Sequence, residues 1–275
     1  MTSSHRFWIN KKILLTGGTG FLGKHVYNNL LKKGVNKKNI LIPRSSSLDL
    51  RKKNNCLKAT KNVDLVIHLA GNVGGIGKNQ KLPATLLYDN LIMGAELIEA
   101  ARVNKVSKFI CLGTICSYPK YTQIPFKEED LWHGYPEETN APYGLAKKIL
   151  LVQTQAYRQQ YGFNSIYLLP VNLYGPGDNF DLNSSHVIPA IIKKITYAKN
   201  KKIDYIEVWG DGTPTREFLY VEDAAKGIIL AAEKYNKPDP VNLGSGFEIS
   251  IIELVKKIAN ILKFKGSIIW DNTKP

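Results

Sequence analysis

A tyrosine and a lysine four residues apart are the strongest sign of chemistry in this sequence. Tyr143 and Lys147 fall in the first turns of a predicted helix, where a spacing of four places both side chains on one face. A phenol has an ordinary pKa of about 10, but an adjacent ammonium group favours the phenolate and makes it a usable acid–base group. The hydroxyl of Thr114, just after a predicted strand, can hold a substrate carbonyl. Together these residues predict proton transfer to a carbonyl oxygen.

A glycine-rich turn is the second chemical feature. Gly17, Gly20 and Gly23 follow an apolar run over Lys12–Thr16, which predicts a buried strand, and they precede a helical pattern. Glycine lets the backbone bend sharply and approach a pyrophosphate, which then meets the unpaired amides of the helix N-terminus. A purely structural turn is the alternative. After the first strand of an alternating pattern, however, the three glycines predict a dinucleotide site.

The end of the second predicted strand indicates which dinucleotide is bound. A carboxylate there would bind the ribose 2′-hydroxyl of NAD, whereas an arginine accommodates the 2′-phosphate of NADP. Arg44 stands at this position and is followed by serines. A surface arginine without a ligand is the alternative interpretation. The residue types favour NADP(H).

Strands and helices alternate through the part of the chain that must position these groups. Strands are predicted over 12–16, 39–43, 63–70, 108–113 and 165–170, and helices over about 21–33, 86–104 and 141–161. This alternation is typical of βαβ units and a parallel sheet with right-handed crossovers. Loops are expected over 71–77 and 174–185, helices over about 188–200 and 221–235, and a strand over 207–209. The sequence therefore predicts an α/β fold.

Composition narrows the function classes. The 275 residues carry a net charge of +15, but the lysines form short pairs rather than a basic block interleaved with aromatic residues, so no nucleic-acid partner is expected. No apolar run approaches the roughly 20 residues of a membrane-spanning helix, and we expect neither a secretory signal nor membrane binding. The three cysteines lack the spacing of a metal site, and they do not form the even-numbered set typical of a disulfide-bonded protein. We therefore expect no metal and a cytoplasmic location.

The sequence resembles the extended short-chain dehydrogenases/reductases, which act on nucleotide sugars. The resemblance covers Lys12 to Pro275 and rests on the glycine turn, Thr114, the Tyr143/Lys147 pair, His68-Leu69-Ala70-Gly71 and Pro170-Val171-Asn172-Leu173-Tyr174-Gly175-Pro176. It implies a Rossmann-type doubly wound parallel sheet with a smaller C-terminal α/β substrate lobe. The NADP-binding domain would cover 11–173 with a return segment over about 217–243, and the lobe would cover 174–216 and 244–275.

The family pattern also implies which residues bind ligands. The implied cofactor residues are Gly17, Thr19, Gly20, Phe21, Leu22, Gly23, Arg44, Asp49, Leu50, Leu69, Ala70, Gly71, Leu112, Tyr143, Lys147, Pro170, Asn172, Leu173 and His186. The implied substrate residues are Val73, Asn172, Asn179, Lys194, Trp209 and Arg216. Cations such as Lys194 and Arg216 suit a nucleotide diphosphate, although each by itself is an ordinary surface residue.

Five segments resemble more narrowly the family members that epimerise C3 and C5 and reduce C4 of GDP-4-keto-6-deoxy-D-mannose with NADPH. They are Val73-Gly74-Gly75-Ile76, Cys116-Ser117-Tyr118-Pro119-Lys120, Asn179-Phe180, Ser185-His186-Val187-Ile188-Pro189-Ala190 and residues 209–218. This implies a GDP-sugar substrate and a homodimer formed through helices of the Rossmann domain.

Protons beside a ketone are acidic, so a base can remove them. Inverting the carbon then needs a base on one face of the sugar and an acid on the other. The Cys116 thiol is a tunable base, and the imidazole of His186 is a side chain that can return a proton. By the family pattern these two residues epimerise, while Tyr143 protonates the C4 oxygen. A buried structural cysteine and a helix-capping histidine are the alternatives.

Two departures from the family pattern bear on activity. Family members usually carry serine where Thr114 stands, and threonine keeps the hydroxyl. Relatives are also expected to continue for several tens of residues beyond Pro275, which would leave the substrate lobe incomplete. The remaining alternatives are another nucleotide-sugar 4-ketoreductase or epimerase, and an NADP-binding relative without turnover. A 4,6-dehydratase is disfavoured, because Ile115-Cys116 stands where those relatives carry an Asp-Glu pair.

Overall fold

The main sheet lies at the centre of the larger part of the molecule. A computed structural model describes residues 3–182 and 184–274, and in these residues six parallel strands follow the order β2-β1-β3-β4-β5-β9. Their bounds are β1 Ile13–Thr16, β2 Ile40–Leu41, β3 Leu65–His68, β4 Lys108–Leu112, β5 Ser165–Pro170 and β9 Val241–Leu243. Because successive side chains alternate, Leu14 packs into the core on one face, and Ile13 and Leu15 pack into the core on the other.

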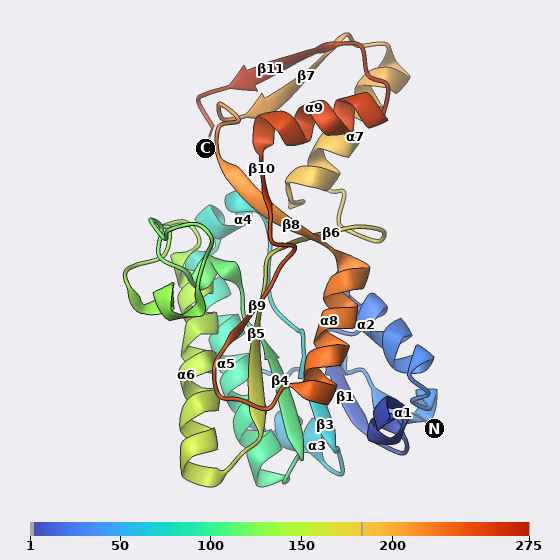
Figure 1. Cartoon of the computed structure of the whole chain (residues 1–275), viewed down its shortest axis with the longest axis vertical. Helices are drawn as coiled ribbons and strands as arrows, with labels where there is room; N and C mark the ends of the chain where they lie inside the picture. Colours follow the sequence, from blue (N-terminus) through green and yellow to red (C-terminus); the bar gives the residue numbers. More distant parts are fainter. Residues whose placement is uncertain (1–2, 183, 275) are drawn as a thin grey trace.

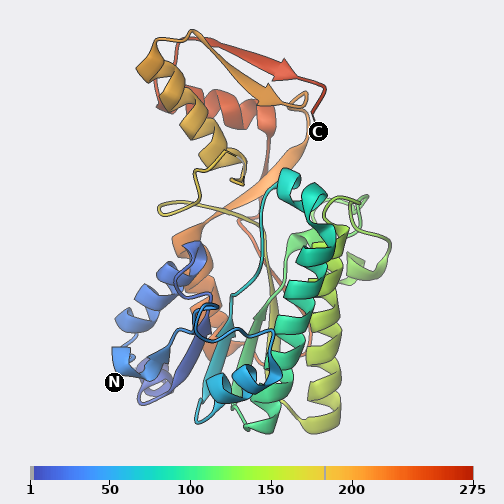
Figure 2. The same ribbon diagram turned by 180° about the vertical axis from the view of Figure 1, so that it is seen from behind.

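Helices cover both faces of this sheet (Figures 1 and 2). On one face lie α3 (Lys53–Thr60), α5 (Pro83–Val103) and α6 (Ala141–Tyr161), and α5 packs along α6. On the other lie α2 (Phe21–Lys32) and α8 (Val221–Lys234), with the short α1 (Ser3–Trp8) beside them. The fold is thus the doubly wound α/β arrangement that the sequence predicted.

The strand order reverses direction at β1. The chain passes from β1 to β2 on one side and then to β3 on the other side of β1. In open α/β sheets, ligands bind outside the carboxyl ends of the strands at such a switch point. The glycine turn after β1 and the residues after β3 both lie at this position.

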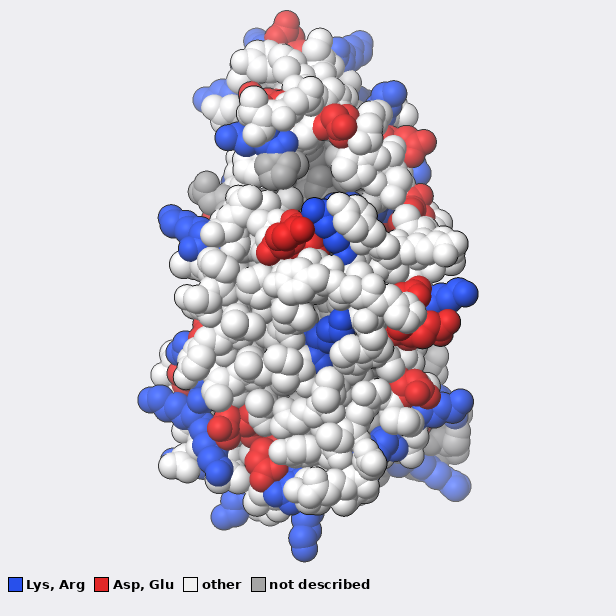
Figure 3. Space-filling model, turned by 90° about the vertical axis from the view of Figure 1, so that its left-hand side faces the viewer, with Lys and Arg blue, Asp and Glu red and all other residues white. Residues whose placement is uncertain are grey.

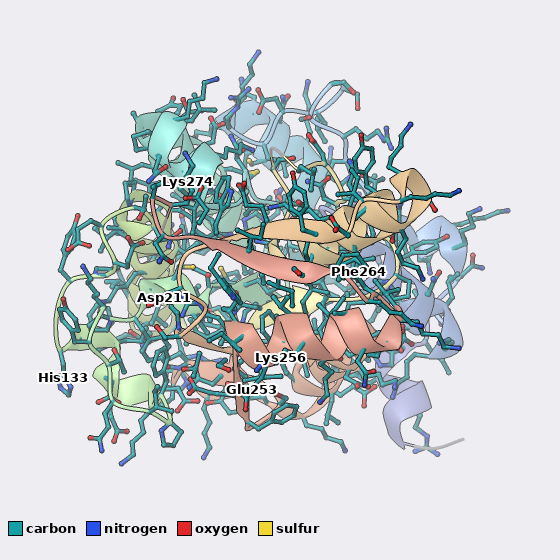
Figure 4. All side chains as sticks on the ribbon, turned by 90° about the horizontal axis from the view of Figure 1, so that it is seen from above. His133, Asp211, Glu253, Lys256, Phe264 and Lys274 are labelled. Carbon is teal, nitrogen blue, oxygen red and sulfur yellow. The ribbon has the colours of Figure 1, made fainter. Side chains whose placement is uncertain are left out.

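A smaller lobe lies beyond the carboxyl ends of the main sheet (Figure 1). A three-stranded sheet, β10-β8-β6, leads into it, and a parallel pair, β7 and β11, packs with α7 and α9 around an apolar core. The bounds are β6 Asn172–Tyr174, α7 Val187–Lys201, β7 Tyr205–Trp209, β8 Thr215–Tyr220, β10 Glu248–Ser250, α9 Ile251–Ile261 and β11 Ser267–Asp271. From above, α9 carries Glu253 and Lys256 on its outer side, and Phe264 lies at the turn into β11 (Figure 4).

The predicted elements agree best where the periodicity is strong. The helix predicted over 141–161 and the strand predicted over 165–170 coincide with α6 and β5. The loop expected over 71–77 is wrong at its end, since α4 (Ile76–Lys81) begins inside it; Asn79, 5% exposed, holds that turn by donating to the carbonyls of Gly74 and Gly75. The loop expected from residue 174 is likewise wrong at its start, where β6 pairs with β8. None of the helices in the described residues is long and apolar enough to cross a bilayer.

Candidate active site

The glycine turn brings β1, α2 and the residues after β3 into close backbone contact. Gly17 has a φ of +69°, and a Cβ built on it would lie 2.8 Å from the amide nitrogen of Ala70. A Cβ on Gly23 would lie 2.1 Å from the carbonyl oxygen of Gly17. The N–H of Gly20 donates to that same carbonyl at 2.9 Å. Only glycine permits these contacts, and they form the cradle that a pyrophosphate needs.

The N-terminus of α2 faces this turn with its amides available. Within the described residues, the first turn of α2 has neither a capping side chain nor an acidic residue. The positive end of the helix dipole and the unpaired N–H groups therefore favour an anion at this position. Of the residues predicted to bind the cofactor, Thr19 lies in the glycine turn, and Phe21 and Leu22 begin α2. The residues present fit the pyrophosphate of a dinucleotide.

The segment after β2 carries two arginines in different environments. Arg51 pairs with both Asp49 and Asp89 at 2.9 Å, and its guanidinium lowers the pKa of the Asp49 carboxyl to about 2. Arg44 is exposed, and no described residue forms an ion pair or hydrogen bond with its guanidinium. Leu50 is buried in the core on the α3 and α5 side of the sheet. Of the two cations, Arg44 is the one free to receive a phosphate.

The end of β3 is fixed to the end of β1 by a buried histidine. Nδ1 of His68 lies 2.8 Å from the Thr16 hydroxyl, which also accepts the N–H of Ala70 at 3.1 Å. Burial lowers the pKa of His68, so the imidazole is neutral. Its Nε2 is buried without a hydrogen-bond partner among the described residues. This contact places Leu69, Ala70 and Gly71 beside the glycine turn, as the dinucleotide site requires.

A buried asparagine that the sequence analysis did not single out fixes the next residues. Asn90, fully buried on α5, accepts the N–H of Asn72 at 3.1 Å and donates to the Asn72 carbonyl at 2.9 Å. The Asn72 side chain then donates to Asp89 and accepts from Lys78. A polar residue inside an apolar helical run was the signal that could have identified Asn90. The exposed side chain of Val73 follows directly.

Tyr143, Lys147, Thr114 and Cys116 meet where α6 begins against the turn after β4. The hydroxyl of Ser117 donates to the Gly144 carbonyl at 2.8 Å, and a Cβ on Gly144 would lie only 2.2 Å from the Cys116 carbonyl oxygen. The two backbones therefore touch. The Thr114 hydroxyl accepts the Cys116 N–H at 3.2 Å and also hydrogen-bonds with the phenol of Tyr143.

Lys147 lies deeper than the other groups of this cluster. Its side chain is 3% exposed, and Nζ lies 3.7 Å from the position of a Cβ on Gly71, so it points toward the dinucleotide loop. The buried hydroxyl of Tyr167 donates to the Lys147 carbonyl at 2.6 Å and occupies the space beside Gly113. Tyr167 thus fixes this turn of α6.

Burial sets the protonation of the catalytic candidates. It raises the pKa of the Tyr143 phenol, with the Cys116 thiol adding to the effect and the Thr114 hydroxyl opposing it. It also raises the pKa of the Cys116 thiol, opposed by the Thr114 hydroxyl and by the positive charge of Arg216. It lowers the pKa of the Lys147 ammonium group. The pKa of the Tyr143 phenol is thus raised, not lowered as its spacing from Lys147 predicted, because burial has the largest effect on it. Tyr143 is therefore protonated at neutral pH and able to donate.

The loop after β6 carries His186 and Asn179 next to the loop of Val73. A Cβ on Gly75 would lie 3.0 Å from the Ser185 carbonyl oxygen, so the two loops are in contact. His186 is exposed at the start of α7, its side chain makes no capping bond, and its charge acts on Asp178. Asn179 donates to the Ser184 hydroxyl at 2.9 Å.

The lobe contributes two separate groups. Arg216, on β8, is near enough for its charge to act on Cys116, whereas Nζ of Lys194 lies 5.9 Å from the ring of Trp209 and donates to the Glu207 carbonyl. Lys194 and Trp209 therefore form a pair of their own between α7 and the end of β7. Asn172 donates to the Glu217 carbonyl at 3.0 Å. Leu112, Pro170 and Leu173 lie at the ends of β4 and β5 and in β6.

A doubly wound sheet that carries a tyrosine–lysine pair and a glycine turn at its carboxyl edge defines a dinucleotide-dependent oxidoreductase. Comparison with known proteins gives the family: residues 13–244 match the model of the NAD dependent epimerase/dehydratase family. The chain belongs to this family.

Three relatives illustrate the similarity. The chain is 41% identical to a GDP-L-fucose synthase from Sinorhizobium fredii (strain NBRC 101917 / NGR234), over 96% of this chain and 84% of that protein. It is 39% identical to a GDP-L-colitose synthase from Yersinia pseudotuberculosis, over 96% of this chain and 86% of that protein. The solved structure of the GDP-mannoheptose C4 reductase from Campylobacter jejuni with NADP bound superposes with a TM-score of 0.87 at 27% identity. The superposition covers 95% of this chain and 88% of that chain.

Proposed function

We propose that this chain epimerises C3 and C5 and reduces C4 of GDP-4-keto-6-deoxy-D-mannose, giving GDP-L-fucose or a closely related GDP-6-deoxy-L-sugar. The observation that carries the proposal is the position of the Cys116 thiol next to the Tyr143 phenol and the Thr114 hydroxyl. Reduction alone needs only the tyrosine and a hydroxyl donor, so a thiol on the turn that carries Thr114 and packs on Gly144, next to Tyr143, indicates additional proton transfer. The GDP-L-fucose synthase relatives support it.

The cofactor is NADP(H). The glycine turn and the amides of α2 would hold its pyrophosphate and Arg44 the 2′-phosphate, and Lys147 lies beside the loop at Gly71. When bound, NADPH supplies the hydride for C4. The NADP-bound reductase structure supports this assignment.

Tyr143 is the acid of the reduction. Burial keeps its phenol protonated at neutral pH, so a proton is available for the C4 oxygen as negative charge develops on it. The Thr114 hydroxyl forms the second hydrogen bond to that oxygen. The buried Lys147 ammonium group stabilises the phenolate that remains.

Cys116 and His186 exchange the protons of C3 and C5. Each of these carbons flanks the C4 ketone, so loss of its proton places the charge on the C4 oxygen, where Tyr143 and Thr114 stabilise it. Cys116 takes the proton from one face after losing its own; burial raises the pKa of its thiol, and the positive charge of Arg216 opposes that rise and so favours the thiolate. His186, on the neighbouring loop, returns a proton from the other face.

The lobe holds the nucleotide part of the substrate. Arg216 and Lys194 supply the charge for the diphosphate, and Trp209, 46% exposed, offers an aromatic face for the base. Asn172 and Asn179, with Val73, contact the sugar from the surrounding loops. We place the reaction in the cytoplasm.

A homodimer through α5 and α6 completes the proposal. Leu87 and Tyr88 on α5 and Ile149 and Val152 on α6 are exposed apolar side chains, with Tyr88 at 62%. Figure 3 views this side of the molecule, on which uncharged residues surround a basic group near the centre and many charged side chains lie toward the edges. Large apolar side chains exposed on two helices that pack together are a reason to expect a subunit interface there. Sedimentation of the purified chain tests the proposal, and a monomer at micromolar concentration would contradict it.

The reaction is tested by incubating the chain with GDP-4-keto-6-deoxy-D-mannose and NADPH in D₂O. The proposal predicts equimolar consumption of NADPH and deuterium at both C3 and C5 of the product. Cys116→Ser is expected to lose deuterium incorporation at both carbons while NADPH binding is retained. No consumption of NADPH by the wild-type chain, or full incorporation by Cys116→Ser, would contradict the assigned roles.

The second candidate is a GDP-sugar 4-ketoreductase without epimerisation, favoured by the similarity to the C4 reductase structure. The same D₂O experiment distinguishes the two functions. A simple reductase consumes NADPH but leaves C3 and C5 without deuterium, because it never removes those protons.

A further inference from the structure

Three segments of the described chain connect the main sheet to the lobe, and one glutamate joins them. The segments are the link from β5 to β6, the link from β8 to α8 and the turn from β9 to β10 (Figure 1). The strands that follow or precede these links form the three-stranded sheet β10-β8-β6. Glu217 lies on its central strand, β8, and it bonds to both neighbouring segments.

The carboxylate of Glu217 is seated in the turn between β9 and β10. Its Oε1 accepts the N–H of Gly246 at 2.7 Å, the N–H of Ser245 at 2.5 Å and the Ser245 hydroxyl at 3.3 Å. A Cβ on Gly244 would lie 2.3 Å from the same oxygen, and Gly246 has a φ of +83°. Successive amides in such a turn form a concave anion site, and here a carboxylate of the chain itself fills it.

The backbone of Glu217 holds the third segment. Its carbonyl oxygen accepts the side-chain amide of Asn172 on β6 at 3.0 Å. One residue thus bonds to the turn before β10 through its side chain and to β6 through its backbone. Hydrogen bonds to an ionised carboxylate are roughly twice as strong as neutral ones, so this junction resists rotation of the lobe.

The next residue along β8 is Arg216. Successive side chains leave a strand on opposite faces, so fixing Glu217 on one face also fixes the direction of Arg216 on the other. The charge of Arg216 acts on the Cys116 thiol, which lies on the main-sheet side of the molecule. A change in the lobe angle would therefore move the cation away from the thiol.

We propose that Glu217 is a positioning residue: by joining β8 to β6 and to the turn before β10, it fixes Arg216, the neighbouring cation assigned to the diphosphate of the GDP-sugar, relative to the main sheet. This inference rests on the proposed function. It predicts that loss of the Glu217 carboxylate weakens sugar-nucleotide binding and epimerisation while NADPH binding, which depends on β1 and α2, is unchanged.

The test compares Glu217→Ala and Glu217→Gln with a matched control, Glu248→Gln. Glu248 is the register partner of Glu217 on β10, and its exposed carboxylate accepts only the Thr215 hydroxyl among the described residues, at 3.0 Å. KM for the GDP-keto sugar, kcat and the NADPH Kd from fluorescence are measured for each. Glu217→Ala is expected to raise KM about tenfold or more with NADPH Kd within about twofold of wild type. The KM of Glu217→Gln, which keeps an acceptor oxygen without the charge, should lie between those of the wild type and Glu217→Ala. The KM of Glu248→Gln should match that of the wild type.

An unchanged KM in Glu217→Ala, or an equal loss of NADPH affinity, would overturn the proposal. If that variant does not fold, Gly244→Ala replaces it, because the added Cβ displaces the carboxylate and leaves the charge in the chain. It must show the same rise in KM, and a wild-type KM would overturn the proposal equally. A wild-type chain that never converts the GDP-keto sugar contradicts the proposed function instead, so the two failures are distinct.

Discussion

Replacing Gly144 with alanine should separate the catalytic groups while leaving the pyrophosphate site at the glycine turn in place. Gly144 lies between Tyr143 and the rest of α6, and its backbone touches the turn that carries Cys116. A Cβ built on Gly144 would lie 2.2 Å from the Cys116 carbonyl oxygen and 2.9 Å from its carbonyl carbon. Both are backbone atoms, so no side-chain rotation relieves the contact.

The size of the effect follows from these distances. Real Cβ atoms essentially never come within 3.0 Å of another heavy atom, so the two backbones must separate by at least 0.8 Å, the difference between 3.0 and 2.2 Å. A displacement of about 1 Å between reacting groups costs roughly a hundredfold in rate. We therefore expect kcat to fall about a hundredfold, equivalent to about 2.7 kcal/mol in the activation free energy.

The assay is the rate of NADPH oxidation with the GDP-keto sugar, together with NADPH Kd and the thermal midpoint. NADPH Kd should change less than kcat, because the pyrophosphate site is formed by the glycine turn and α2, whereas the atoms nearest the added Cβ belong to Cys116 and Ser117. Gly77→Ala is the matched control: Gly77 is also helical, and apart from its chain neighbours and the backbone of its own helix no described atom lies within 4 Å of its added Cβ. The reasoning is refuted if Gly144→Ala keeps kcat within about threefold of wild type, or if Gly77→Ala loses as much.

Three further predictions concern stability and cofactor choice. Gly94→Ala places a Cβ 2.2 Å from Cδ1 of Leu150 between α5 and α6, so it should lower the free energy of unfolding by about 1–3 kcal/mol while kcat is unchanged, as chemical denaturation and kinetics would show. Burial lowers the pKa of Lys108 to about 8 from 10.5, so the folded chain binds fewer protons than the unfolded chain between these values. The free energy of unfolding, measured relative to Lys108→Met, should therefore rise by about 3 kcal/mol from pH 8 to 10.5, and a flat difference would be evidence against this. Arg44→Ala should weaken NADPH about tenfold to a hundredfold and leave NADH unchanged, checked by titration; equal losses would show that Arg44 does not bind the 2′-phosphate.

The sequence by itself determined the fold class and the groups of the dinucleotide site. Apolar strand segments alternate with amphipathic helical segments along the chain. A parallel sheet covered by helices on both faces buries the apolar side of every one of these elements. The glycine spacing after the first strand was equally decisive, since only glycine permits the contacts found at Gly17 and Gly23. Tyr143 and Lys147 were found because their helical spacing is a local property.

Weakly patterned elements required the tertiary structure. The helix α3 has a polar sequence, yet Cys56 and Ala59 are buried against the core beneath α5. The helix α4 begins in a glycine-rich segment and is held by Asn79. Tertiary contacts decide the conformation of such segments, because their intrinsic helix propensity favours no single conformation.

The relation between distant residues was also decided only by tertiary structure. Asn90 fixes Asn72, and Glu217 joins Asn172 to the turn at Gly246, although nothing in their spacing indicates either contact. Buried polar groups must find partners wherever the packed chain supplies them, and that depends on the three-dimensional arrangement rather than on periodicity. Residue types and local spacing thus determined which chemistry this chain carries, while packing decided how its groups are held.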